Sequence, residues 1–127
     1  MKRKHAGSLT TVMEAIAPEG AAISVITYGE MMEGVLFDRK GQPALNFQRW
    51  ERFIEPFDVL NVTQGIAEVW ASVRGLLRSR GLLILDNDLI IASTALHLDL
   101  TVVTLNKRDF GRVDGLSLFI PELPERV

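Results

Sequence analysis

Hydrophobic residues follow two patterns along this chain, and the two patterns alternate. Continuous apolar runs rich in β-branched residues are typical of buried parallel strands, whereas apolar residues spaced three and four apart are typical of helices that bury one face. The runs predict strands at residues 21–27, 57–62, 100–105 and 116–120. The helical spacing predicts helices at residues 9–17, 28–38, 44–55, 63–80 and 87–98. Thr63 is the expected N-cap of the helix at 63–80, and Gly81 is expected to end it. Such alternation predicts an α/β fold with one mainly parallel sheet and right-handed crossovers.

Length and composition narrow the class of protein. A chain of 127 residues fits one domain, so we expect residues 1–127 to form a single domain. A net charge of −2 excludes a generally basic nucleic-acid coat, so nucleic-acid binding would need a local basic rim or bridging metal ions. The absence of cysteine excludes disulfides and thiolate metal sites. Without a secretory signal or a membrane-length apolar run, we expect a cytoplasmic protein that does not bind membranes.

The stretch LDNDLIIASTAL, residues 85–96, carries the strongest chemical signal in the sequence. It places Asp86 and Asp88 at the N-terminus of an apolar helix, where unpaired N–H groups and the helix dipole stabilise anions. Capping explains one acid, since Asp86 or Asn87 is a suitable N-cap. Two neighbouring carboxylates repel and desolvate each other, and a bound divalent cation relieves that cost. The stretch therefore indicates either a capped buried helix or a metal site.

Other oxygen-bearing side chains follow two of the predicted strands. Glu30 comes after the strand at 21–27, and Asn106 and Asp109 come after the strand at 100–105. Ligands of parallel α/β sheets bind at the carboxyl ends of the strands, so these side chains should converge. Oxygen ligands without His or Cys suit Mg²⁺ or Mn²⁺, which serve phosphoryl chemistry.

Each of these residues also has a simpler explanation. Glu30 falls in the first turn of a predicted helix, where the dipole alone favours an acid. Asn106 and Asp109 lie in a predicted loop, where Asn and Asp are common turn residues. Lys107 and Arg108 fit ordinary solvated charges.

Two segments resemble a known family. The segments ISVITYGEMMEG, residues 23–34, and LDNDLIIASTALHLDLTVVTLNKRDFGRVDGLSL, residues 85–118, resemble a PIN domain. The chain is most similar to the VapC-type toxins of bacterial and archaeal toxin–antitoxin pairs, over about residues 9–121. The resemblance implies a PIN-like three-layer α/β/α fold. It also implies three or four acidic residues that hold one or two Mg²⁺ or Mn²⁺ ions and cleave RNA.

The resemblance also assigns roles to individual residues. Glu30 matches the acid that follows the second strand of the family, and Asp88 matches the acid before the IASTA pattern. Asn106 matches a position after the fourth strand that is Asn or Asp in the family. Asp109 is the nearby acid of the DF ending, and Asp86 resembles an auxiliary acid. The resemblance thus implies Glu30, Asp86, Asp88 and Asp109 as metal ligands. It implies Glu30, Asp88, Asn106 and Asp109 as the catalytic residues.

The chain departs from the family pattern at its start. Family members begin with a strand of the type LLLDTN, whose Asp is the first metal ligand. Here the segment SLTTVMEAIAPEG, residues 8–20, resembles the part that follows that strand and its helix, and MKRKHAG precedes it. We therefore expect the first central strand to be missing, with weak metal binding and poor RNA cleavage as the result.

Together, the residues and the resemblance predict a metal-dependent endoribonuclease of toxin type. Lys107, Arg108 and Arg112 are expected to contact RNA phosphates. A cognate antitoxin and a second copy of the chain are the expected protein partners. One alternative is a nuclease-impaired PIN module that still binds an antitoxin. Another is a non-enzymatic Mg²⁺-binding regulatory domain such as a receiver, which needs an Asp at the end of a central strand.

Overall fold

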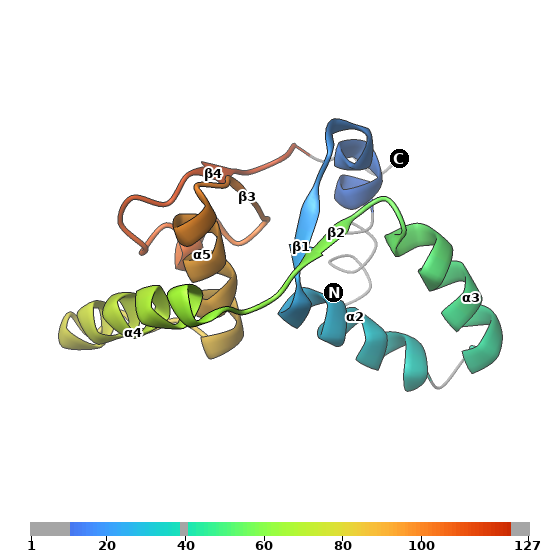
Figure 1. The fold of residues 1–127 in the computed structure, drawn as a ribbon, viewed down its shortest axis with the longest axis horizontal. Coiled ribbons are helices and arrows are strands. Elements are labelled where there is room, and N and C mark those ends of the chain that lie inside the picture. Colours follow the sequence, from blue (N-terminus) through green and yellow to red (C-terminus); the bar gives the residue numbers. More distant parts are fainter. Residues whose placement is uncertain (1–10, 39–40, 123–127) are drawn as a thin grey trace. The chain divides into compact units, whose positions relative to one another are not determined.

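The computed structural model describes residues 11–38 and 41–122, which fall into two compact units (Figure 1). One unit is Met13–Asn61, and the other joins Val62–Val127 to Met1–Val12. The segment MKRKHAG, predicted to stand in place of a first strand, lies outside the described residues. Within the described ranges, no helix is long and apolar enough to cross a membrane.

The unit Met13–Asn61 is built on one parallel strand pair and two helices. Residues 11–16 are helical, and the chain passes through the short 3-10 helix η1 at Ala17–Glu19 into the first strand. The elements that follow are β1 (Ala22–Ser24), α2 (Val25–Leu36), α3 (Pro43–Ile54) and β2 (Asp58–Leu60). β1 pairs with β2 in parallel, with Ile23 opposite Val59. Helices α2 and α3 lie against each other.

The boundary between β1 and α2 differs from the prediction. Residues 21–27 were predicted as one strand, but the chain turns helical at Val25. The Ser24 hydroxyl accepts a hydrogen bond from the Ile26 N–H at 3.1 Å and caps the helix. β-branched residues resemble a strand in sequence, and the cap overrides that preference. As a consequence Glu30 lies beyond the first turn of α2, so the dipole does not explain it.

Trp50 anchors α3 in the core of this unit. Its side chain is buried, the Tyr28 ring meets it edge-on at 4.8 Å between centroids, and Phe47 lies at 6.0 Å. Edge-to-face aromatic pairs stabilise a fold beyond the area that they bury. At the end of α2, by contrast, Leu36 and Phe37 are 49% and 77% exposed.

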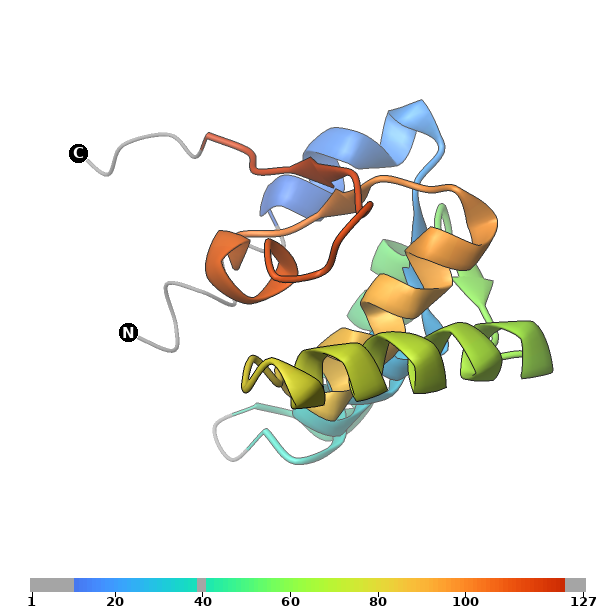
Figure 2. The same cartoon turned by 90° about the vertical axis from the view of Figure 1, so that its left-hand side faces the viewer.

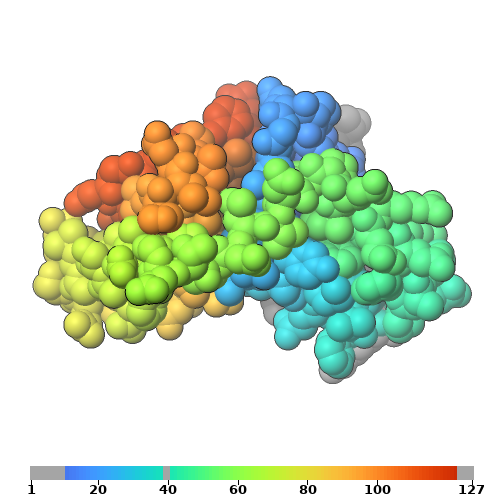
Figure 3. Space-filling view, in the orientation of Figure 1, coloured from blue at the N-terminus to red at the C-terminus, as the bar shows by residue number. Residues whose placement is uncertain are grey.

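The second unit holds most of the predicted site residues. Its elements are α4 (Gln64–Ser79), α5 (Asp86–Leu98), β3 (Val102–Val103), α6 (Lys107–Phe110) and β4 (Leu118–Phe119). Helix α5 crosses α4 and packs against it (Figure 2). The core consists of buried residues from these helices, from β3 and from the loops before α5 and after α6, namely Leu77, Ile84, Leu89, Ala92, Ala95, Val102, Phe110 and Val113. The opposite face of α4 is exposed and forms part of the surface in Figure 3.

Both ends of α4 are set by residues that the sequence analysis identified from their chemistry. The Thr63 hydroxyl accepts a hydrogen bond from the Ile66 N–H at 3.3 Å, which caps the N-terminus as predicted. At the other end Gly81 has φ of +68°. The N–H groups of Gly81 and Leu82 donate to the carbonyls of Arg78 and Leu77, an arrangement that closes many helices.

The strands are parallel, as predicted, but their arrangement differs in one respect. One sheet was predicted, whereas the described strands form two separate pairs, β1 with β2 and β3 with β4. Each strand is only two or three residues long. The described part of the chain contains no further strand that could pair with both. In the resembled family, the first strand is the one that occupies the centre of the sheet.

Gly75 inside α4 and Gly81 just after its end should respond oppositely to the same substitution. An added Cβ at Gly75, inside the helix, would meet no atom within 4 Å, so Gly75→Ala should stabilise the protein by about 0.5–1 kcal/mol. Gly81→Ala should destabilise it by about 1–2 kcal/mol, because the left-handed backbone strains an L side chain. Urea denaturation of both variants measures the difference. Equal effects would contradict this account of the helix end.

Candidate metal site at the first turn of α5

The first turn of α5 carries Asp86 and Asp88 in different directions. The helix begins one residue earlier than predicted, so Leu85 occupies the N-cap position and neither Asp86 nor Asn87 caps the helix. Asp86 and Asp88 become the first and third residues of the helix. A residue advances by about 100° around an α-helix, so these two side chains leave it about 200° apart. One carboxylate therefore approaches α4 and the other approaches α6.

Asp88 lies beside Asp109 of α6. Burial raises the pKa of the Asp88 carboxyl above its ordinary value of 3.8, and the negative charge of Asp109 raises it further. Helices α5 and α6 contact each other, which holds the two acids together. A pair of nearby carboxylates in a half-buried position is an arrangement that a divalent cation stabilises.

Asn106 fixes the second member of this pair. Its side-chain oxygen accepts the Asp109 N–H at 3.3 Å, which caps the four-residue helix α6. Its side-chain Nδ2 donates to the Asp109 carboxylate at 3.1 Å. The Thr104 hydroxyl in turn accepts the Asn106 N–H at 3.0 Å. The loop after β3 thus holds Asp109 in place by a chain of short-range hydrogen bonds.

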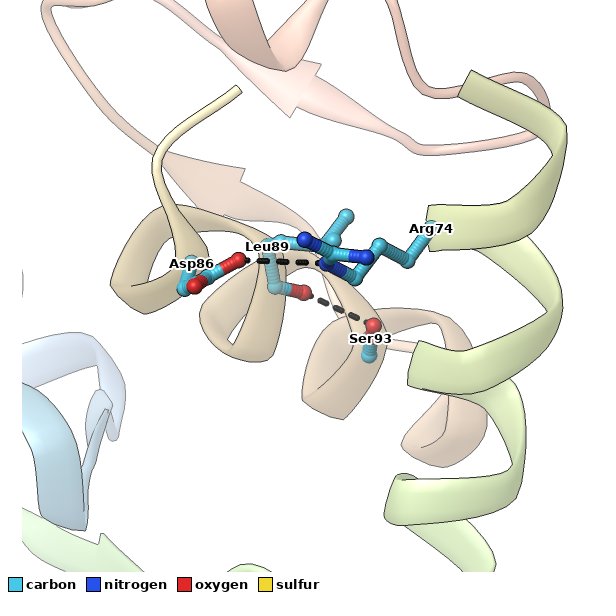
Figure 4. Close-up of polar contacts among 4 residues, drawn as sticks. All are labelled: Arg74, Asp86, Leu89 and Ser93. Atoms are coloured by element: carbon cyan, nitrogen blue, oxygen red, sulfur yellow. Dashed lines mark hydrogen bonds and ion pairs between the residues drawn. The ribbon is translucent and has the colours of Figure 1, made fainter. Parts of the chain in front are cut away.

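Asp86 is engaged elsewhere. Its carboxylate accepts a hydrogen bond from Arg74 Nε of α4 at 3.3 Å (Figure 4). The guanidinium carbon of Arg74 lies 5.7 Å from the centre of the Trp70 ring, within the range of a cation–π contact. The structure therefore separates Asp86 from the pair formed by Asp88 and Asp109.

The three predicted RNA-binding cations have different surroundings. Lys107 and Arg108 are exposed at the start of α6, next to Asn106. Arg112 is half-buried, and its Nη1 donates to the Leu83 carbonyl at 3.2 Å. Arg112 thus links the segment after α6 to the segment before α5, which gives it a structural role.

Glu30 lies exposed on α2, in the unit Met13–Asn61, whereas the other predicted ligands lie in the second unit. Its approach to Asp88 stays a prediction. In the described residues, no group of three or more His, Asp and Glu side chains comes close enough to hold a metal ion. The pair Asp88–Asp109, with the Asn106 amide oxygen, supplies oxygen donors of the type that Mg²⁺ and Mn²⁺ prefer, and further donors are needed to complete a site.

Two residues of this region were missed from the sequence. Thr104 bonds the backbone two residues ahead, a local turn that the sequence Thr-Leu-Asn could have suggested. Arg74 precedes Asp86 by twelve residues, and only the packing of α4 on α5 brings them together. No local pattern could have found that contact.

The comparisons with known proteins identify the family. Residues 2–116 match the PIN domain family. The chain is 30% identical to Ribonuclease VapC2 of Rickettsia felis over 116 residues, which cover 91% of this chain and 85% of the relative. It is 34% identical to Ribonuclease VapC1 of Methanocaldococcus jannaschii over 101 residues, 80% of this chain and 70% of the relative. The chain belongs to the PIN domain family, which confirms the resemblance seen in the sequence.

Solved structures show the same fold. A crystal structure of VapBC2 from Rickettsia felis, bound to a DNA fragment from its promoter, superposes with a TM-score of 0.73 at 28% identity. It covers 86% of this chain and 81% of the matched chain. A crystal structure of FitAcB from Neisseria gonorrhoeae gives a TM-score of 0.75 at 27% identity, covering 80% and 76%. These matches confirm the predicted PIN-like α/β fold.

The raised pKa of Asp88 predicts a stability gain on neutralisation. A carboxyl whose pKa is higher in the folded state favours folding below pH 3.8, and this contribution is lost as the pH rises through the folded pKa. Asp88→Asn should therefore stabilise the metal-free protein at pH 7, by at most about 1 kcal/mol because the site is partly solvated. The gain should vanish near pH 3. Thermal unfolding at both pH values measures it.

Asp86→Asn is the matched control for this prediction. The same change two residues earlier removes the contact with Arg74 and a charge that the helix dipole favours, so it should destabilise slightly at pH 7. If Asp88→Asn also destabilised at pH 7, the proposed repulsion between Asp88 and Asp109 would be wrong.

Proposed function

We propose that this protein is a metal-dependent endoribonuclease, the toxin of a toxin–antitoxin pair. The observation that carries the proposal is the pair Asp88–Asp109, whose charges repel in a half-buried position and which Asn106 holds fixed. A pair of carboxylates that lowers the stability of the folded protein until a cation binds is characteristic of a functional site rather than of packing. The relatives named Ribonuclease VapC2 and Ribonuclease VapC1 support the reaction class.

Each residue of the site has a separate role in this proposal. Asp88 and Asp109 would hold Mg²⁺ or Mn²⁺, and Asn106 keeps the Asp109 carboxylate oriented toward the site. We propose Glu30 as a further ligand, and we assign to Asp86 a supporting role because Arg74 engages it. When bound, the metal would polarise the phosphodiester and activate a water for in-line attack. Lys107 and Arg108 are exposed beside Asn106 and would bind flanking RNA phosphates.

We also propose a protein partner of antitoxin type. Several matched structures are VapBC or FitAB complexes, including the VapBC complex of Salmonella typhimurium at 31% identity and a TM-score of 0.71. An antitoxin that covers the acidic metal ligands would place cationic side chains against them, because like charges repel across an interface and opposite charges attract.

The alternative functions are separated by particular observations. A PIN module without nuclease activity would bind an antitoxin and fail to cleave RNA. A receiver needs an Asp at the end of a central strand, and the described strands end in Ser24, Leu60, Val103 and Phe119. The receiver is therefore disfavoured.

Neutralising the acid pair should abolish cleavage. A fluorogenic RNA assay with Mn²⁺ should show weak but measurable cleavage by the parent protein, in line with the poor cleavage expected from the sequence. Asp88→Asn and Asp109→Asn should lower that rate by about a hundredfold or more, because the metal would be held loosely. Mn²⁺ should raise the melting temperature of the parent more than that of either variant. Asp114→Asn is the control, because Asp114 pairs with Arg80 and has no role in the proposed site.

Two results would count against this proposal. Cleavage by Asp88→Asn at the parent rate would show that the acid pair is not catalytic. Mn²⁺-dependent stabilisation without cleavage of any RNA would favour the nuclease-impaired module.

The exposed end of α2 predicts self-association. Phe37 is 77% exposed and Leu36 is 49% exposed, and large apolar side chains of this kind are typical of interfaces. We expect a homodimer in sedimentation velocity at tens of micromolar, and Phe37→Ser should shift it toward monomer. A monomeric parent protein at that concentration would contradict this expectation.

A further inference from the structure

Arg74 stands out because two contacts fix a flexible side chain at the surface. Its stem rises from α4, its Nε donates to Asp86 at 3.3 Å, and its guanidinium carbon lies 5.7 Å from the Trp70 ring centre. Figure 4 shows the side chain reaching from α4 toward the first turn of α5. Despite these contacts, the Arg74 side chain is 31% exposed. A guanidinium held this way has lost much of its conformational freedom before any ligand arrives.

Trp70 provides the support beneath this group. The ring packs against the core of the second unit, and its Nε1 is buried with no hydrogen-bond partner in the described part of the chain. The half-buried Trp70 ring thus lies against the Arg74 guanidinium, and the Arg74 side chain remains partly exposed.

The position of the Arg74 guanidinium relative to the pair Asp88–Asp109 suggests a function for it. Asp86 and Asp88 lie two residues apart on the first turn of α5, one toward Arg74 and the other toward Asp109. The guanidinium and the acid pair thus lie on opposite sides of one helix, whose diameter with side chains is about 10 Å. A single-stranded RNA that reaches the acid pair can place a neighbouring nucleotide near Arg74.

We propose that Arg74 is a stacking platform for a base of the single-stranded RNA substrate, an inference that rests on the proposed function. Guanidinium planes stack on bases much as aromatic rings do. The bond to Asp86 occupies Nε at the edge of the guanidinium and leaves the side of the plane that faces away from Trp70 for a base. The ion pair with Asp86 also neutralises the positive charge of Arg74. The guanidinium therefore contacts the flat face of a base rather than a charged phosphate. Because every base has such a face, the contact tolerates any sequence.

Arg74→Lys tests the plane separately from the charge. Lysine keeps the positive charge and can keep the contact with Asp86, but it has no plane to stack on a base. Binding of a labelled single-stranded RNA is measured by fluorescence anisotropy in Ca²⁺, with intact RNA verified on a gel. Arg74→Lys should weaken binding about fivefold or more, the effect of losing one stacked base. The dependence on salt concentration should stay unchanged, since no phosphate contact is lost.

Two comparisons make the test specific. Arg80→Lys should bind RNA like the parent, because Arg80 also pairs with an aspartate, Asp114, at 2.9 Å, and no cation–π contact of Arg80 occurs in the described residues. An abasic oligomer of the same length should bind the parent and Arg74→Lys equally well. Thermal unfolding of each variant confirms that the fold is retained.

The outcomes separate this inference from the proposed function. If the parent cleaves RNA and Arg74→Lys binds as tightly as the parent, the function stands and the platform is wrong. If only Arg74→Gln weakens binding and lowers the salt dependence, Arg74 acts as a charge on a phosphate, which also overturns the platform. If the parent neither binds nor cleaves RNA, the proposed function fails and the platform fails with it.

Discussion

The burial of α5 is the constraint on which the second unit depends. Its consecutive residues Ala92, Ser93, Thr94 and Ala95 are all buried, which requires neighbours on nearly every side. The two hydroxyls are tolerated because Ser93 and Thr94 donate to the carbonyls of Leu89 and Ile90 within the helix. A helix enclosed in this way cannot rotate about its axis without breaking the core. The directions of its first-turn side chains are therefore set by packing and not by their own contacts.

This constraint explains how one short segment serves two purposes. Asp88 is held beside a second acid at a cost to stability, while Asp86 contributes a favourable contact with α4. Proteins commonly store such local costs at functional sites and offset them by packing elsewhere. Here the burial of Leu89, the residue after Asp88, offsets the repulsion between the two acids. Asp88 is thus carried by a helix that is anchored in the core of the unit.

Sequence reasoning succeeded where the controlling interactions are local. Thr63, Gly81 and the apolar stretch of α5 define their elements through hydrogen bonds and burial within a few residues. It failed at Val25, where a cap outweighed β-branched preference, and at Leu85, where a shift of one residue removed the predicted cap. Asp88 and Asp109 come from separate segments, and the sequence assigned them to one site only through the family resemblance. The ion pair between Asp86 and Arg74 depends on the crossing of α4 and α5, so no local sequence pattern predicts it.

Asn106 has a consequence for how the loop after β3 orders itself. Its amide presents an acceptor to the backbone of Asp109 and a donor to the carboxylate of the same residue, so both bonds form without any ion. An aspartate at this position, which the resembled family also uses, would replace the donor with an oxygen facing a negative charge. The loop would then close fully only around a cation. Under the proposed function, the choice of amide or acid at residue 106 would decide whether a metal ion meets an ordered loop or orders it on binding.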